Sequence, residues 1–170
     1  MKFKQNEEPV KEKEMRMDKE LHEMFIRMIQ MEINKLTFIS SAKYYFFTTG
    51  EMKYKKFFKC LYKNCEELKK CLIGYLMSHL EDIPEFTIPK ININFKDSVE
   101  PFKQMAEWED EFIKYLNDMI DKAFEVKDWQ AFHYLLKKLD GIDHLCCRAL
   151  AAVEHGADIM DLCEQPSKEK

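Results

Sequence analysis

The sequence has few residues that interrupt helices. Its 170 residues include only 4 Gly and 5 Pro, whereas Met is abundant, at 11. Because Gly and Pro are the poorest helix formers, and Lys, Glu, Leu and Met are good ones, this composition favours long helices. Hydrophobic residues make up 46% and charged residues 34%, a balance that excludes an intrinsically disordered chain. At this length we expect one domain with a single core.

Several marks of membrane, secreted and nucleic-acid-binding proteins are also missing. No apolar run is long enough to span a bilayer, and the highly charged start of the chain lacks the apolar stretch of a secretory signal. The net charge is −4 and the positive charges form no stripe, so we expect neither a nucleic acid nor a membrane as partner. The six cysteines form no CxxC pair. We expect free thiols and an intracellular, cytoplasmic location.

Apolar residues spaced three and four apart predict four amphipathic helices. The first spans about 18–47, the second spans about 51–80, and the short break at Gly50 indicates a hairpin. The third runs from about 98 to 125. The fourth starts after Asp128 and continues as one helix to about Gly156. Its buried seam consists of Phe132, Leu135, Leu139, Ile142, Cys146, Ala149 and Val153.

Residues 81–98, EDIPEFTIPKININFKDS, do not continue the helical pattern. The two prolines exclude a helix, and Ile91 and Ile93 alternate with asparagines, as in an extended segment. An extended chain covers ~3.3 Å per residue, so this segment is long enough to cross the length of a bundle. Four helices with one long middle connection predict an all-α four-helix bundle, with a crossover between helices two and three.

These patterns also predict the organisation of the whole chain. We expect the bundle to occupy residues 17–160. Residues 1–16 are expected to form a disordered charged tail, because they are rich in Lys and Glu and contain Pro9. Residues 161–170 are expected to form a polar tail.

Three glutamates fall at or beside positions that the helical patterns predict to be buried. Glu32 and Glu109 lie in the seams of the first and third helices, and Glu67 borders the apolar face of the second. An unpaired buried carboxylate is costly, so a cluster of them indicates bound cations, as in the di-iron sites of helical bundles. Alternatively, each glutamate reaches the rim of the bundle or pairs with a lysine. Lys35 is a ready partner for Glu32.

Three segments share the layout of one known family. They are MIQMEINKLTFISSAKYYF, CLYKNCEELKK and QMAEWEDEFIKYLNDMIDKAFEVKDWQAFHYL. They resemble the first, second and third helices of the ferritin family, and the resemblance extends from about Leu21 to Ile159. It places Glu32, Glu67 and Glu109 at iron-ligand positions, with Glu67 as the bridging ligand. It therefore implies a ferritin-like bundle, iron as the cofactor, and a role in iron binding or iron storage.

The sequence departs from the family at other metal-ligand positions. The histidine that follows the bridging glutamate is replaced by Lys70, and the Glu-Gln pair of the fourth helix falls on Gly141 and Ile142. A protonated lysine offers no lone pair to a metal. We therefore expect ferroxidase activity to be weakened or lost. If Lys70 lies inside the bundle, it can neutralise the glutamates, and if it lies outside, they need another cation.

Three hypotheses for the function follow from this degenerate site. The first is a divergent ferritin-like protein that binds or stores iron, and the alternative is a metal-free pseudo-ferritin that acts as a structural or interaction subunit. The third is a working di-iron oxidase with a rearranged ligand set. Candidate residues for that set are Asp140, Asp143 and His144, with Glu66 as a further candidate beside Glu67. A zinc site from His144, Cys146 or Cys147 matches no standard spacing.

The end of the sequence bears on the assembly. Few residues follow Ile159, and they are too polar to form the fifth helix that typical ferritins use in their cage contacts. The resemblance therefore implies a smaller self-association, or docking to another protein, rather than the usual cage. Exposed cysteines and aromatic residues are candidates for that partner surface, with ordinary amphipathic surface as the alternative. The aromatic residues are Tyr54, Phe58, Trp108 and Tyr115.

Overall fold

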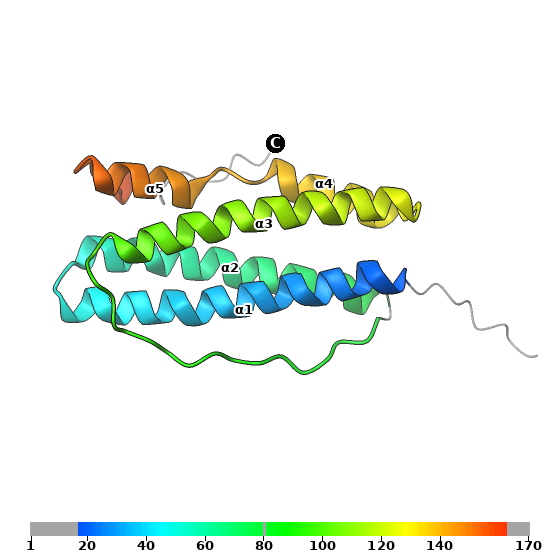
Figure 1. Cartoon of the computed structure of the whole chain (residues 1–170), viewed down its shortest axis with the longest axis horizontal. Helices are drawn as coiled ribbons and strands as arrows, with labels where there is room; N and C mark the ends of the chain where they lie inside the picture. The colour runs from blue at the N-terminus through cyan, green and yellow to red at the C-terminus, as the bar shows by residue number, and fades with distance from the viewer. Residues whose placement is uncertain (1–16, 80, 163–170) are drawn as a thin grey trace, which may run out of the picture.

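The protein is an all-helical bundle. The computed structural model describes residues 17–79 and 81–162, so the predicted tail at 1–16 and residues 163–170 lie outside the described residues. The helices are α1 (Lys19–Thr48), α2 (Met52–Ser78), α3 (Glu100–Glu125), α4 (Trp129–Asp140), α5 (Leu145–Glu154) and a short 3₁₀ helix, η1 (Met160–Leu162). Helices α1 and α2 form a hairpin, α3 lies alongside it, and α4 and α5 follow one another in the fourth position (Figure 1). This confirms the predicted all-α four-helix bundle.

No helix in the described part of the chain is both long enough and apolar enough to cross a membrane.

The ends of α1 are set by local hydrogen bonding. Asp18 is its N-cap, and the Asp18 carboxylate accepts hydrogen bonds from the backbone N–H groups of Glu20 and Leu21, both at 3.1 Å. Such a cap satisfies donors that the first turn leaves unpaired. At the other end the chain reverses through Gly50, whose φ of 77° lies in the left-handed region. The reversal brings α2 back against α1.

The long connection between α2 and α3 is an extended crossover along the bundle, as predicted (Figure 1). The side chain of Gln30 on α1 holds it, because its amide donates to the Thr87 carbonyl at 2.7 Å and accepts from the Thr87 N–H at 3.1 Å. Further along, the N–H of Asn92 donates to Ser41 Oγ at 3.3 Å. These contacts fix the backbone of the crossover on α1, while Ile88 and Ile91 remain 77% and 65% exposed.

The core consists of two hydrophobic clusters at opposite ends of the bundle. On α1, one cluster includes Leu21 to Ile29 and the other begins at Ile39. Glu32 and Lys35 lie between the two clusters and are themselves buried. The middle of the bundle therefore contains charge where a continuous apolar core would otherwise run.

The aromatic residues predicted to be exposed are mostly packed against the bundle. Phe58 is completely buried, so its prediction as a partner-surface residue is wrong. Tyr54 and Trp108 are half-buried and contact the rings of Phe102 and Phe38, each with centroids 5.0 Å apart. The half-buried Tyr115 donates its hydroxyl to the Met24 carbonyl at 3.2 Å. The apolar spacing alone did not separate core rings from surface rings.

The fourth helix differs from the predicted continuous one, because it is divided. Helix α4 ends at Asp140, and α5 begins at Leu145 after a short non-helical segment. Within the break, His144 adopts a left-handed φ of 53°, and Asp143 Oδ1 accepts a hydrogen bond from the Leu145 N–H at 3.2 Å. Gly141 is a poor helix former and follows the last residue of α4. The seam still predicted buried residues on both sides of the break, such as Leu135 and Ala149.

Two glycines offer a matched test of this description. Gly50 requires a left-handed backbone, whereas Gly74 lies inside α2, where an added Cβ would meet nothing within 4 Å. We expect Gly50→Ala to lower the free energy of unfolding by about 1 kcal/mol, because Ala disfavours φ above zero. Gly74→Ala should raise it by roughly 0.5–1 kcal/mol through helix propensity. Urea unfolding measures both, and shifts of the same sign would contradict the assigned conformations.

Candidate functional site

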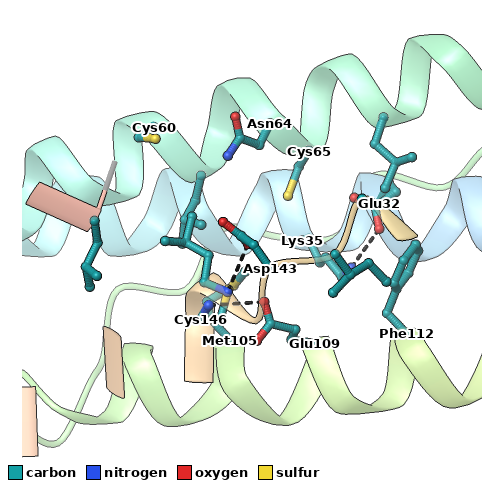
Figure 2. A pocket seen from close by; sticks show the side chains of 16 residues that line it. Glu32, Lys35, Cys60, Asn64, Cys65, Met105, Glu109, Phe112, Asp143 and Cys146 are labelled. Atoms are coloured by element: carbon teal, nitrogen blue, oxygen red, sulfur yellow. Dashed lines mark hydrogen bonds and ion pairs between the residues drawn. The ribbon is translucent and has the colours of Figure 1, made fainter. Parts of the chain in front are cut away.

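A cavity of about 410 Å³ lies in the middle of the bundle, beside the break between α4 and α5. Its walls come from α1, α2, α3, the break, the start of α5 and the end of η1 (Figure 2). Apolar side chains form much of the lining. The polar and thiol-bearing residues that line it are Glu32, Lys35, Cys60, Asn64, Cys65, Glu109, Asp143 and Cys146. The cavity thus collects two of the three glutamates that the sequence singled out.

Glu32 and Lys35 form a buried ion pair on α1. Lys35 Nζ lies 2.6 Å from Glu32 Oε1, and the side chains are only 10% and 1% exposed, respectively. The spacing of three residues places both on one face of the helix. The Lys35 ammonium also lies 4.3 Å from the centre of the Phe112 ring, which faces it from α3. Lys35 is the partner for Glu32 that the sequence suggested, and in the structure this lysine supplies the counter-charge of the buried carboxylate.

The electrostatics of the pair favour a charged lysine. Burial by itself lowers the pKa of Lys35, but the Glu32 carboxylate, together with smaller contributions from Cys65 and Cys146, outweighs it and the resulting pKa is raised. Lys35 therefore carries a positive charge at neutral pH. Each member supplies the counter-charge that its partner needs in the interior.

One oxygen of Glu32 has no such partner. Glu32 Oε2 is buried and accepts no hydrogen bond from the described residues. The Cys65 thiol, a weak hydrogen-bond donor, lies close enough to this carboxylate for the negative charge to affect the pKa of the thiol. Burial, then the charge of Glu32, and last a weak side-chain hydrogen bond to that carboxylate raise the pKa of Cys65, so the thiol stays protonated and neutral.

Glu109 has a different partner, which is the start of α5. Its Oε1 accepts a hydrogen bond from the Cys146 N–H at 3.1 Å (Figure 2). Its Oε2 accepts one from the Cys147 N–H at 3.0 Å. The first N–H groups of a helix lack partners within it and carry partial positive charge, so they suit a carboxylate. A glutamate on α3 therefore caps α5 from outside. This contact accounts for a carboxylate in the seam of α3.

The predicted bridging ligand, Glu67, lies on the surface of α2. Its side chain is 61% exposed, and Lys70 Nζ lies 3.8 Å from it. Lys70 is also exposed and lies 3.7 Å from Glu66. None of these three residues lines the cavity. The structure thus places Lys70 outside the bundle, and Lys35 rather than Lys70 provides the internal cation.

The candidates for a rearranged ligand set lie in or beside the break. Asp140, Asp143 and His144 are all exposed, and the break removes the helical face that Asp140 and His144 would share. Only Asp143 lines the cavity, as does Ile142. Asp143 also pairs with Arg148 at 3.2 Å. In the described ranges, no three His, Cys, Asp or Glu side chains are grouped so that they can hold a metal ion.

These residues do not fit a di-iron centre as they stand. Glu32 shares one oxygen with Lys35, Glu109 uses both oxygens for backbone N–H groups, and Glu67 lies away from the cavity.

The external cap on α5 is the feature that sequence reasoning missed. The sequence signal for the break that makes this cap possible was Gly141, a residue that often ends helices, followed by Asp143, a residue type that often caps them. Both lie inside an otherwise regular seam.

Comparisons with known proteins identify the fold. No family model and no curated protein match the sequence. Among solved structures, a humanized archaeal ferritin is 13% identical with a TM-score of 0.78, covering 89% of this chain and 98% of its own. An open pore ferritin from the archaeon Archaeoglobus fulgidus is 12% identical with a TM-score of 0.76, covering 91% and 100%. The ferritin of Chlorobium tepidum is 16% identical with a TM-score of 0.73, covering 82% and 87%. The chain therefore has a ferritin-like fold.

The buried ion pair makes a prediction about stability. Lys35→Met should lower the free energy of unfolding by about 3–5 kcal/mol, because it leaves Glu32 charged and buried without a partner. Glu32→Met/Lys35→Met removes both charges and should cost far less than the single change. Chemical denaturation of both variants measures the difference. As a control, Lys70→Met affects only a surface pair and should change stability by less than about 1 kcal/mol. An equally small effect of Lys35→Met would contradict the buried pair.

The cap on α5 makes a second prediction. Glu109→Ala should lower the free energy of unfolding by about 1–2 kcal/mol, because two N–H groups at the start of α5 lose their acceptor. Hydrogen exchange at Cys146 and Cys147 should also accelerate. Glu107→Ala, on an exposed position of α3, is the matched control and should leave both quantities nearly unchanged. Unchanged exchange in Glu109→Ala would show that α5 does not depend on this carboxylate.

Proposed function

We propose that this protein is a metal-free, ferritin-like subunit with a structural or interaction role in a larger assembly. The observation that carries the proposal is the ion pair in the middle of the bundle, with Lys35 Nζ 2.6 Å from Glu32 Oε1. The resemblance noted in the sequence puts an iron-ligand glutamate at Glu32. In this proposal the lysine ammonium supplies the positive charge that a metal would otherwise bring.

The remaining predicted ligands support the same proposal. Glu109 is neutralised by the N-terminus of α5, and Glu67 pairs with Lys70 on the surface. Iron oxidation requires metal ions held with open coordination positions. With these carboxylates engaged in these ways, the described residues offer no ligand set for that reaction. Ferroxidase activity is therefore absent in this proposal.

An interaction role is supported by apolar side chains that the bundle leaves exposed. On the crossover these include Ile88 at 77% and Ile91 at 65%, although their backbone is held against α1. At the end of α1, Tyr44 and Phe47 are more than half exposed. Contiguous exposed apolar surface is characteristic of protein contacts, and in this proposal these side chains contribute to such a surface. We propose self-association as the main use of this surface.

A role in iron binding or storage is the second candidate. It is favoured by the likeness to structures named as ferritins and by Glu32 Oε2, a buried carboxylate oxygen without a partner among the described residues. In this candidate, the chain binds iron weakly near Glu32 and oxidises it slowly or not at all. The two candidates differ in bound iron, which is directly measurable.

The test is to load the purified protein anaerobically with ferrous iron and then admit air. We expect no stoichiometric iron and no oxidation beyond the rate in buffer, because Lys35 already neutralises Glu32.

Mass photometry on the same sample should show particles larger than one chain. Bound iron without rapid oxidation would favour the second candidate. Two irons per chain with rapid oxidation would overturn the metal-free proposal, and a single-chain mass would overturn the assembly role.

A further inference from the structure

We propose that the central cavity binds a small, neutral molecule that carries a hydroxyl group on an apolar body. This inference concerns the bundle of a single chain and does not depend on the assembly. The cavity has a volume of about 410 Å³, which lies within the range of small-molecule sites, roughly 300–1,000 Å³. The lining combines an apolar wall with a few buried polar groups, as small-molecule sites generally do, and here two of these groups are the Glu32–Lys35 pair.

The apolar wall comes from several elements around the break between α4 and α5. Leu68 of α2, Ile142 of the break, and Met105 and Phe112 of α3 all line the cavity. Met105 and Phe112 are labelled in Figure 2. Asn64 and Asp143 are exposed residues of the same lining, so they mark where the cavity meets solvent. An apolar ligand body can therefore enter between α2 and the break.

Glu32 determines which polar group the ligand needs, namely a hydrogen-bond donor. Its Oε2 atom is buried, lacks a partner among the described residues and belongs to a side chain that is only 1% exposed. Leaving such an acceptor unsatisfied is costly, so a bound donor gains binding energy there. The other lining carboxylates are already engaged, Glu109 by the start of α5 and Asp143 by Leu145 and Arg148. Glu32 Oε2 is thus the acceptor left for a ligand.

A hydroxyl group suits this position better than an amine or a carboxylate. It donates one hydrogen bond to Glu32 Oε2, and its oxygen can accept one from the neighbouring Lys35 ammonium, which has three donors. Glu32 and Lys35 already balance each other's charge. Burial raises the pKa of both Cys65 and Cys146, so these thiols add no charge. A charged ligand would lose its hydration without gaining a free counter-charge.

The test uses four probes that share a benzene ring and differ in one substituent: benzyl alcohol, toluene, benzylamine and benzoate. Calorimetry gives their affinities for the full-length protein, and methyl NMR locates the site through the signals of Met105 and Ile142. We expect saturable binding of benzyl alcohol, with shifts of both methyl signals. The other three probes should bind at least about tenfold more weakly, the size expected for one hydrogen bond to a charged group.

Three variants complete the test. Glu32→Met/Lys35→Met removes the polar pair without leaving a buried charge, and it should abolish the preference for benzyl alcohol over toluene. Leu68→Trp fills part of the cavity and should weaken all probes by at least about tenfold. Glu67→Gln, next to Leu68 but outside the cavity, is the matched control and should leave the affinities unchanged.

The outcomes separate this proposal from its rivals. Toluene binding as tightly as benzyl alcohol would show an apolar cavity without a polar site, and tighter binding of benzylamine would show a cation site. Either result, or the absence of saturable binding, overturns the proposal. Loss of the preference in the double variant, with binding retained in Glu67→Gln, supports it. The iron measurement is made separately, so the failure of one proposal does not imply the failure of the other.

Discussion

A carboxylate inside a helical bundle needs a counter-charge or hydrogen-bond donors, and the centre of this protein depends on that requirement. Glu32 lies between two hydrophobic clusters and its side chain is only 1% exposed, so an unpaired charge there would be costly. Lys35 lies one turn away on the same helix and supplies the positive charge. Because both partners come from α1, the pair is formed by a single helix. The other helices need only pack around it, as Phe112 does against the ammonium.

The second central carboxylate is satisfied by the backbone, and this links the site to the shape of the fourth helix. Glu109 on α3 binds the first N–H groups of α5, and these groups exist as free donors only because the helix starts anew at Leu145. A continuous fourth helix would use these donors internally. The break and the seam glutamate are therefore two parts of one arrangement. Together they also form one wall of the cavity.

The sequence predicted the architecture because the buried stripes on each helix follow a regular spacing. Leu116 and Leu135, for example, are fully buried as their stripes required, and the prolines of the crossover mark it correctly as non-helical. The side-chain directions at the edge of a stripe were not predictable in the same way. Glu67 borders its stripe, where the spacing is compatible with either an inward or a solvent-facing side chain, and it turns to solvent. A small rotation of a helix decides between these outcomes, and it is set by packing against all its neighbours.

The candidate site was predictable in part for the same reason. Glu32, Lys35 and Glu109 were recognisable as inward carboxylates with a nearby lysine, and the structure brings all three to one cavity. Their partners were harder to foresee. The pairing of Glu109 depends on backbone N–H groups 37 and 38 residues away in the sequence, and such donors leave no mark in a pattern of side chains. Only the tertiary fold brings them together.

The most direct test of a lysine in place of a metal is diffraction at the iron absorption edge, from crystals soaked anaerobically in ferrous iron. The account predicts no anomalous peak beside Glu32 or Glu109, with Lys35 Nζ still in hydrogen-bond contact with the Glu32 carboxylate. Strong peaks at both glutamates, with Lys35 displaced from Glu32, would contradict it.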